Sequence, residues 1–487
     1  MATVGPACDQ AQTLGALIRA GVDVFRLNAA HGTRDDHQRR LDIIRASSRE
    51  VNIPVGVLLD LAGPKIRLGA LPGGVLECVA GAVVRFVRGP AATVDSNLHA
   101  EVYTGKDAPA AEAGGPPRIL TTTYPTLVDE LDPGHRVMLA DGTVSLVVES
   151  KEADAVNCRV VQGGTIRSRQ GVNLPRVRLQ VPPLNEEDRA NAVWAARAGV
   201  DFVGLSFVRA AGDVHELKRV LAAENATAQV VAKIEKPEAL DDLEAIVAAT
   251  DAVMVARGDL GVEIDIAQVP AAQKRIISAC TRAGKPVIVA TQMLESMHAS
   301  RMPTRAEAAD VANAILDGAD ACMLSGETAI GQYPVEAVET MHRIALATEP
   351  LLRERARTAG PPPDTEGLDP ITRAIACHAG RLAETLEARL ILVATASGTT
   401  ARALSRGRWF VPTLGISANE ATLRRMCLYW GVIPLANVRA DSPDALLQEV
   451  VTRGQSRGWL GAGDRIVLLA GTGLTTTAHN SIVVHEV

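Results

Sequence analysis

Residues 230–255, VVAKIEKPEALDDLEAIVAATDAVMV, contain one complete repeat of the pattern that organises most of the chain. A short apolar run at 230–232 is followed by a helix-like stretch at 238–248 and by a second apolar run at 252–255. Short β-branched runs are typical of parallel strands buried on both faces, and the apolar residues between them have helical spacing. The segment therefore predicts a strand, a helix and a second strand.

The same kind of apolar run recurs along the chain, with further helix-like stretches such as 213–221 between the runs. The runs lie at 3–4, 24–27, 55–59, 202–205, 230–232, 252–255, 287–290 and 321–324. Eight alternating strand and helix units close into a (β/α)8 TIM barrel. We therefore expect an α/β fold with a barrel formed by residues 1–65 and 173–348.

One interval in this series is much longer than the others. The third run begins at 55 and the fourth only at 202, whereas a usual repeat takes roughly 20–35 residues. The intervening segment, 66–172, has glycine and proline turns and alternating stretches at 144–148 and 157–161, which indicate a small β-rich domain. An insertion after a barrel strand lies on the catalytic face, so we expect it to act as a lid.

The composition changes again near 357–370, where three consecutive prolines and two glycines occur. This stretch predicts a linker, with bounds at 349–370. Residues 371–487 have their own apolar runs at 390–393 and 466–469 and predict a third, α/β domain.

Charge and composition exclude several classes of protein. The 487 residues include 50 Lys and Arg against 56 Asp and Glu, and no basic block indicates a nucleic-acid partner. No apolar run approaches the roughly 18 residues of a membrane span, and the N-terminus lacks a secretory pattern. Seven cysteines without a close pair argue against disulfides and a cysteine zinc site. We expect a cytoplasmic protein without a membrane partner.

Polar residues follow nearly every predicted barrel strand. In a barrel these strand ends meet at one mouth, where polar groups are usually catalytic. One such residue would be an ordinary strand-end group, but their number favours an active site. They are Arg26 and Asn28, Asp60, Ser206 and Arg209, Lys233 and Glu235, Arg257-Gly258-Asp259, Thr291-Gln292 and Ser325-Gly326-Glu327.

The acidic residues at these strand ends limit which kinds of reaction the site can catalyse. Glu235 and Asp259 offer hard oxygen ligands that suit Mg²⁺ or Mn²⁺. Lys233 lies two residues before Glu235, so both side chains point to one face of a strand. The alternative is that the two acids form salt bridges with Lys233 and Arg257.

The cations and the glycine fit phosphoryl transfer. A lysine beside a divalent cation, with Arg26 and Arg67 within reach, can stabilise a migrating phosphoryl group. Gly258 lets the backbone approach a ligand closely, and its amide can bind a carboxylate.

The sequence resembles pyruvate kinase along nearly its whole length. The resemblance implies a barrel with a β-rich lid and a C-terminal regulatory domain. It also implies phosphoryl transfer from phosphoenolpyruvate to ADP, giving pyruvate and ATP, by a cytoplasmic homotetramer. It is carried by FRLNAAHG (25–32), LLDLAGPKIRLG (58–69), GVNLP (171–175), VAKIEKPEAL (231–240), VMVARGDLGVEI (253–264), KPVIVATQMLESM (285–297) and PTRAEAADVANAILDGADACMLSGETAIGQYPVEAV (303–338).

The resemblance also implies roles for individual residues. Glu235 and Asp259 would bind the catalytic Mg²⁺, and Lys233 would neutralise the moving phosphoryl group. The amides of Gly258 and Asp259, with Thr291, would hold the substrate carboxylate.

Further roles concern the phosphates and the proton. Arg26 and Arg67 would clamp phosphates, and Ser325 and Glu327 would support proton delivery to the enolate. The proton donor stays open between Thr291 and an ordered water. Four residues would border the nucleotide: Pro6, Asn28, His31 and Arg67.

The chain departs from the family where many members bind K⁺. The corresponding residues here are Asn28, Ala30, Asp60 and Leu61, so one hydroxyl ligand is lost at Ala30. Lys65 stands where K⁺-dependent members carry Glu, and its ammonium group would replace the ion. Our hypothesis is that K⁺ is not required; the alternative is that Lys65 is simply solvated.

The C-terminal domain contains a candidate effector loop in the stretch 392–402. A strand, a hydroxyl-rich turn and a helix start can bind phosphate, and the family receives sugar phosphates or nucleotides here. The alternative is an ordinary capped helix. Trp459, Arg465 and the turn at 471–473 would complete the site. The loop residues are Thr395, Ser397, Gly398, Thr399 and Thr400.

Two other functions stay open at this stage. The first is another barrel enzyme that uses phosphoenolpyruvate or pyruvate, which would lack the inserted lid and the Lys233 and Glu235 pair. The second is a regulatory paralogue that binds metabolites without catalysis, against which the intact Lys233, Glu235, Asp259 and Thr291 argue.

Overall fold

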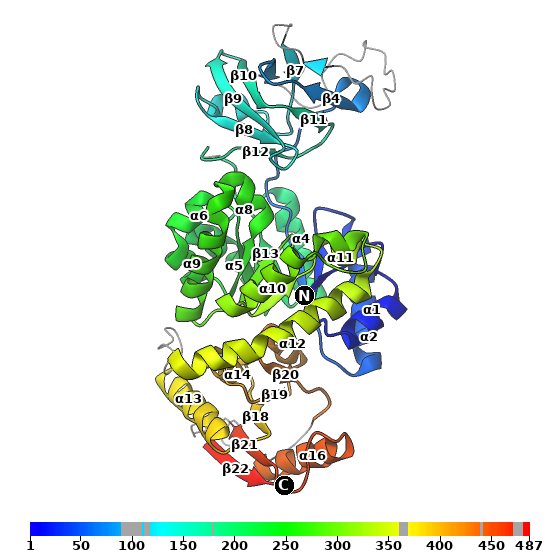
Figure 1. The fold of residues 1–487 in the computed structure, drawn as a ribbon, viewed down its shortest axis with the longest axis vertical. Coiled ribbons are helices and arrows are strands. Elements are labelled where there is room, and N and C mark those ends of the chain that lie inside the picture. The colour runs from blue at the N-terminus through cyan, green and yellow to red at the C-terminus, as the bar shows by residue number, and fades with distance from the viewer. Residues whose placement is uncertain (89–109, 112–116, 178–179, 360–368, 439–441, 471–480) are drawn as a thin grey trace.

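A computed structural model describes residues 1–88, 110–111, 117–177, 180–359, 369–438, 442–470 and 481–487. Figure 1 shows three bodies stacked along the long axis: a β-rich body, a central barrel, and an α/β body below it. The three bodies follow the order that the sequence predicts, with the β-rich body inserted into the barrel sequence.

The central body is a barrel of eight parallel strands, which confirms the predicted fold class. Each predicted apolar run overlaps one strand of the sheet. The sheet closes where Ala2 bridges Leu324, with a hydrogen bond of 3.0 Å from the Thr3 amide to the Leu324 carbonyl. In sheet order the strands are β1 (Ala2–Thr3), β2 (Val24–Asn28), β3 (Gly56–Asp60), β13 (Phe202–Leu205), β14 (Gln229–Ile234), β15 (Ala252–Ala256), β16 (Val287–Ala290) and β17 (Ala321–Met323).

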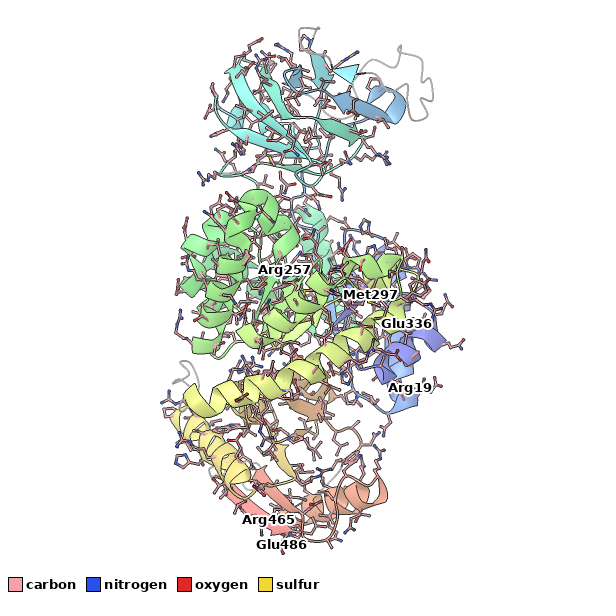
Figure 2. All side chains as sticks on the ribbon, viewed as in Figure 1. Arg19, Arg257, Met297, Glu336, Arg465 and Glu486 are labelled. Carbon is pink, nitrogen blue, oxygen red and sulfur yellow. The ribbon has the colours of Figure 1, made fainter. Side chains whose placement is uncertain are left out.

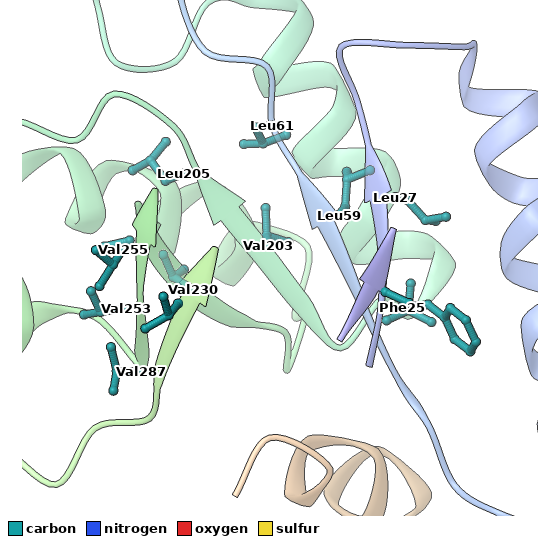
Figure 3. Packing of buried hydrophobic residues seen from close by; sticks show 14 of the residues in the cluster. Phe25, Leu27, Leu59, Leu61, Val203, Leu205, Val230, Val253, Val255 and Val287 are labelled. Atoms are coloured by element: carbon teal, nitrogen blue, oxygen red, sulfur yellow. The ribbon is translucent and has the colours of Figure 1, made fainter. Parts of the chain in front are cut away.

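Alternate residues of these strands enter two different cores. One set, which includes Leu59, Val203 and Val255, packs outward against the surrounding helices (Figure 3). The other set, which includes Leu58 and Met254, fills the barrel and joins a core shared with the C-terminal body. Burial on both faces explains why these strands read as continuous apolar runs.

Helices surround the barrel, with one difference from the prediction. The stretch 238–248 forms two helices separated at Asp242, because Asp242 leaves helical geometry and its carboxylate accepts the Ala211 amide at 2.9 Å. The helices are α1 (Ala11–Arg19), α2 (Arg34–Val51), α4 (Glu186–Ala198), α5 (Ala211–Ala223), α6 (Pro237–Asp241), α7 (Leu243–Ala249), α8 (Arg257–Glu263), α9 (Val269–Arg282), α10 (Arg305–Asp317), α11 (Gly326–Ala329) and α12 (Pro334–Ala359), with 3-10 turns η2 (Ile266–Gln268) and η3 (Glu295–His298).

The inserted body is built on two sheets around its own apolar core. The larger sheet has the order β12-β8-β9-β10-β5-β7, and the smaller has the order β11-β4-β6. Its elements are η1 (Pro72–Gly74), β4 (Val75–Cys78), β5 (Val83–Val87), β6 (Ala110–Ala111), β7 (Arg118–Leu120), α3 (Leu127–Glu130), β8 (Arg136–Leu139), β9 (Val144–Lys151), β10 (Ala155–Gln162), β11 (Gly164–Arg167) and β12 (Val172–Asn173).

The C-terminal body is a five-stranded sheet with helices, of order β20-β19-β18-β21-β22. The long helix α12 lies between it and the barrel in Figure 1. Because α12 continues to Ala359, the prediction of a linker from residue 349 is wrong for the residues up to 359. The elements are α13 (Pro370–Thr385), β18 (Leu390–Ala394), α14 (Thr399–Arg406), β19 (Thr413–Ile416), α15 (Glu420–Met426), β20 (Val432–Pro434), α16 (Pro443–Ser456), β21 (Arg465–Ala470) and β22 (Ser481–Glu486).

In the part of the chain that the structure describes, no helix combines the length and apolar character needed to cross a bilayer.

Candidate active site

The centre of the barrel mouth is a buried lysine with three polar neighbours. Lys233, near the end of β14, places its Nζ atom 2.7 Å from Glu235 Oε1, 3.3 Å from Asp60 Oδ1 and 2.7 Å from Ser206 Oγ. The Ser206 hydroxyl in turn donates to the Leu61 carbonyl at 2.7 Å. Burial alone lowers the pKa of Lys233, but the charges of Asp60 and Glu235 outweigh burial and raise it. The lysine therefore stays protonated.

Asp60 is the second centre of charge and is only 1% exposed. Its Oδ2 atom accepts a 2.8 Å hydrogen bond from Arg26 Nε, and Oδ1 faces Lys233. Burial alone raises the pKa of Asp60, but Lys233 and Arg26 outweigh burial and hold the pKa below its ordinary value. The neighbouring strand must carry glycine here, since a Cβ atom on Gly204 would lie 2.9 Å from Asp60 Oδ1.

Glu235 and Asp259 form the acidic part of the mouth. Glu235 Oε2 accepts the Phe207 amide at 2.8 Å, and Phe207 has a left-handed φ of 56°. Burial and the nearby charge of Asp259 raise the pKa of Glu235 despite its contact with Lys233. The two acids interact electrostatically, and both offer carboxylate oxygens, the ligand type that suits a divalent cation such as Mg²⁺.

The first turn of α8 meets the end of β16. The Gly258 amide donates to Thr291 Oγ1 at 2.8 Å, and the Thr291 hydroxyl donates to the Ala290 carbonyl at 2.7 Å. Arg257 pairs with Asp310 at 2.7 Å. Of the two ion pairs considered as alternatives, Lys233–Glu235 is therefore present, whereas Arg257 has a different partner from Asp259.

The turn after β17 is held by Glu327, which is fully buried. One of its oxygens accepts the Ser325 amide at 2.7 Å, and the other accepts the Leu294 amide at 3.0 Å. The Ser325 hydroxyl is buried without a hydrogen-bond partner among the described residues. Glu327 thus positions the backbone, and Ser325 has a free hydroxyl.

A cationic rim lies on the side of the mouth that faces the inserted β-rich body. Burial, followed by the charges of Arg67, Arg26 and Lys65, lowers the pKa of His31. Arg67 donates to the Arg169 carbonyl at 3.2 Å. Pro6 is exposed. The structure therefore gathers Arg26, His31, Lys65 and Arg67, where anionic phosphates would be attracted.

Comparison with known proteins agrees with this geometry. The family described as "Pyruvate kinase, barrel domain" matches residues 1–338, and "Pyruvate kinase, alpha/beta domain" matches residues 373–485. The chain belongs to the pyruvate kinase family. Members of this family are phosphotransferases whose substrates are phosphoenolpyruvate and ADP, and they generally use a divalent metal ion.

Individual relatives are similar over nearly the whole chain. A pyruvate kinase of Mycobacterium tuberculosis is 40% identical over 100% of this chain and 97% of its own length. A pyruvate kinase of Geobacillus stearothermophilus is 39% identical over 99% of this chain and 78% of its own length. The crystal structure of a pyruvate kinase from Cryptosporidium parvum has a TM-score of 0.86 at 31% identity and covers 100% of this chain and 95% of that one.

The residues expected to correspond to a K⁺ site have partners within the chain. Asn28 Oδ1 accepts the Ala30 amide at 3.2 Å, the Leu61 carbonyl accepts the Ser206 hydroxyl, and Asp60 faces Arg26 and Lys233.

The structure does not bring Lys65 into contact with that group. Its side chain is exposed and has no hydrogen bond or ion pair with any residue that the structure describes. The charge of Lys65 contributes to the lowered pKa of His31.

The candidate effector loop follows β18. Gly398 has a φ of 87°, and its amide donates to Thr395 Oγ1 at 3.0 Å. Ser397 Oγ lies 2.9 Å from Thr399 Oγ1, and Thr400 is buried in the first turn of α14. The loop therefore gathers hydroxyls and amides at one helix start.

The expected partners Arg465 and Trp459 do not join that loop. In the parallel register of β18 and β21, Ala394 faces Ala470 and Leu390 faces Ile466, so Arg465 lies at the opposite end of the sheet. The Trp459 carbonyl accepts from Arg389 at that same end, and Figure 2 shows Arg465 beside Glu486 at the tip of the body. The expectation for both residues is wrong. The turn at 471–473 lies outside the described residues.

Two contacts at the mouth could not be predicted from the sequence. Ser206 was visible as a strand-end polar residue, but nothing in the sequence showed that it bridges Lys233 and the strand of Asp60. The Phe207 amide that holds Glu235 had no sequence signal, because backbone donors are not distinguished by residue type.

Proposed function

We propose that the chain transfers the phosphoryl group of phosphoenolpyruvate to ADP with Mg²⁺ or Mn²⁺, without a requirement for K⁺. The observation that carries the proposal is the buried network in which Lys233 contacts Glu235, Asp60 and Ser206. A buried cation of this kind, fixed in advance, can stabilise charge that moves during phosphoryl transfer.

Each group at the mouth then has a defined task. Lys233 and Arg26 hold the phosphoryl oxygens of phosphoenolpyruvate. The amides of Gly258 and Asp259, with Thr291, hold its carboxylate. Four residues border the nucleotide: Pro6, Asn28, His31 and Arg67.

Glu235 and Asp259 would hold the divalent ion. When bound, the ion supplies a positive charge that neutralises phosphate oxygens. The two acids suit a divalent cation, because a cation between them would relieve their mutual repulsion.

The enolate left after transfer must receive a proton. Ser325, with its free buried hydroxyl, and Thr291 lie at neighbouring strand ends of the mouth. Glu327 holds the turn that presents Ser325. We propose that these residues support proton delivery, directly or through an ordered water.

The proposal of K⁺ independence rests on charge rather than contact. The Ala30 side chain has no ligand atom, and the oxygens of Asn28, Asp60 and Leu61 already have partners. Lys65 adds a positive charge to the same rim. A side chain that is exposed in the free protein can turn toward a bound, anionic substrate.

Regulation and assembly follow the family. We propose that the hydroxyl-rich loop from Thr395 to Thr400 binds a phosphorylated effector, and that the chain works as a cytoplasmic homotetramer.

The test is pyruvate formation from phosphoenolpyruvate and ADP, measured with Mg²⁺ in Na⁺ and in K⁺ buffers. We expect rates equal within two-fold in the two buffers, and loss of activity on chelation of the metal. Lys65→Glu should lower the rate in Na⁺ about ten-fold, and K⁺ should restore part of the lost rate. A several-fold stimulation of the natural chain by K⁺ would contradict the role of Lys65. Absence of pyruvate from the folded protein would indicate a regulatory paralogue instead.

A further inference from the structure

A second buried ion pair lies beside the phosphoryl-transfer network and has no task in it. Lys236 Nζ lies 2.7 Å from Glu263 Oε1, and the side chains are 9% and 1% exposed. Burial of two charges is unfavourable unless each is well paired, so such a pair needs an explanation.

The pair joins two elements that carry the candidate metal ligands. Lys236 follows Glu235 directly after β14. Glu263 is the last residue of α8, whose first turn carries Asp259. Any displacement of Glu263 therefore acts on the helix that presents Asp259.

The same glutamate also reaches the lid. Asn173, at the end of lid strand β12, donates from Nδ2 to Glu263 Oε1 at 3.4 Å, and both side chains are buried. Packing supports this contact, since a Cβ atom on Gly142 of the lid would lie 3.7 Å from the Val262 side chain of α8.

Asn173 lies where the two connections between lid and barrel are bonded together. The Val172 amide donates to the Ile66 carbonyl at 2.9 Å, and Gly171 bridges Arg67. Asn173 is thus two residues from the strand partner of Arg67, the lid arginine of the cationic rim.

Lys236 and Asn173 both donate to the same carboxylate oxygen of Glu263, which leaves the other oxygen available. Its Oε2 atom is buried without a hydrogen-bond partner in the described chain. Glu263 can therefore accept a further hydrogen bond where the lid meets the barrel, and Lys236 balances its charge. Lys236 in turn lies 5.6 Å from the ring centre of Phe207, whose amide holds Glu235.

We propose that Glu263, held by Lys236, is a positioning residue that fixes the lid through Asn173 and so places Arg67 over the barrel mouth. The pair aligns the lid with the helix of Asp259 and takes no part in the chemical step. The kinetic expectation rests on the proposed function, in which Arg67 contacts the nucleotide.

The first test removes only the lid bond. Asn173→Ala should raise KM for ADP about three- to ten-fold while kcat and KM for phosphoenolpyruvate stay within two-fold, because the barrel groups are untouched. Asn157→Ala is the matched control: Asn157 bonds Ser150 and Glu152 within the lid and should leave all three constants unchanged. An unchanged KM for ADP in Asn173→Ala would overturn the claim that this contact places Arg67 over the barrel mouth.

The second test removes the charges without leaving one unpaired. Lys236→Met combined with Glu263→Met replaces the pair by apolar side chains of similar volume, which buried sites tolerate. This variant should show the same rise in KM for ADP, and adding Asn173→Ala should produce no further rise. Independent, multiplicative effects would overturn the proposal.

A third readout does not depend on activity. Amide hydrogen exchange over residues 170–174 should be faster in Asn173→Ala than in the natural chain, while exchange in β14 is unchanged. Faster exchange with no change in KM for ADP would show that the contact between Asn173 and Glu263 holds the two bodies together but that Arg67 does not contact the nucleotide. Unchanged exchange would show that the contact between Asn173 and Glu263 does not hold the lid to the barrel.

Discussion

Lys233 shows how far single-residue chemistry determines the site. It is buried and protonated because Asp60 and Glu235 compensate the loss of water around it. Each acid is in turn held by another group: Asp60 by Arg26 and Glu235 by the Phe207 amide. The network is therefore balanced only while every member is present.

Lys233→Met should test this balance. We expect kcat to fall at least about 10²–10³-fold, because a fixed charge is lost where charge moves. The free energy of unfolding should fall by about 3 kcal/mol, because two acids remain buried.

Steady-state kinetics and denaturant unfolding measure both effects. The control is Lys218→Met, which removes a half-exposed partner of Asp251 and should leave kcat unchanged. A Lys233 variant with more than a tenth of the natural kcat would contradict the assigned role.

Asp188 is a residue whose effect depends on pH. It accepts a 3.1 Å hydrogen bond from the Ala62 amide, where the chain leaves β3 toward the inserted body, and burial raises its pKa from 3.8 to about 6. The unfolded chain loses this proton first, so the contribution of Asp188 to stability declines as pH rises from about 4 to 6.

The pH dependence can be isolated with Asp188→Asn. Between pH 4 and pH 8, the free energy of unfolding of the variant should gain about 2–3 kcal/mol relative to the natural chain. The measurement is denaturant unfolding at several pH values. A constant difference across this range would show that the pKa is not raised.

At the level of elements, aspartates just before barrel strands join neighbouring strands. Asp201, Asp251 and Asp320 each accept a hydrogen bond from a backbone amide near the start of the adjacent strand, from Val57, Val230 and Val287 respectively. Two of them also bind the C-terminal body. Arg424 donates to Asp201 at 2.8 Å, and Arg408 lies 3.1 Å from Asp320.

Asp201→Ala and Asp251→Ala form a matched pair. Asp201→Ala should lower the free energy of unfolding by about 3–5 kcal/mol, because Arg45 and Arg424 lose a buried partner. Asp251→Ala removes the same kind of strand bond and a contact with the half-exposed Lys218, and should cost about 1–2 kcal/mol. Denaturant unfolding distinguishes them, and equal losses would show that the contacts of Asp201 with Arg45 and Arg424 contribute nothing.

At the level of the whole molecule, the barrel and the C-terminal body share one core. Barrel-filling residues such as Leu58 pack in the same apolar cluster as Leu423 and Met426 of α15. The floor of the barrel is thus closed by the C-terminal body, and the two should unfold together.

Met426→Ala should weaken this shared core. Met426 is fully buried, so we expect a loss of about 2–5 kcal/mol and separation of unfolding into two steps. Calorimetry measures both. The control is Met302→Ala, since Met302 is 64% exposed and should not affect stability. A single unchanged transition in Met426→Ala would contradict the shared core.

The sequence by itself determined the eight strands, the insertion and the residues of the mouth. Strands buried on both faces leave continuous apolar runs, and parallel topology brings their ends together whatever the details of packing. Lys233 and Glu235 could be placed on one face from their spacing alone.

Only the tertiary structure decided how those residues are paired. The partner of Arg257, the bridge through Ser206 and the end of the sheet at which Arg465 lies depend on register between segments far apart in the chain. The break at Asp242 depends likewise on a neighbouring element, because the Asp242 carboxylate accepts a hydrogen bond from the Ala211 amide. Local patterns report burial and backbone preference, whereas contacts between distant segments are fixed only when the whole core packs.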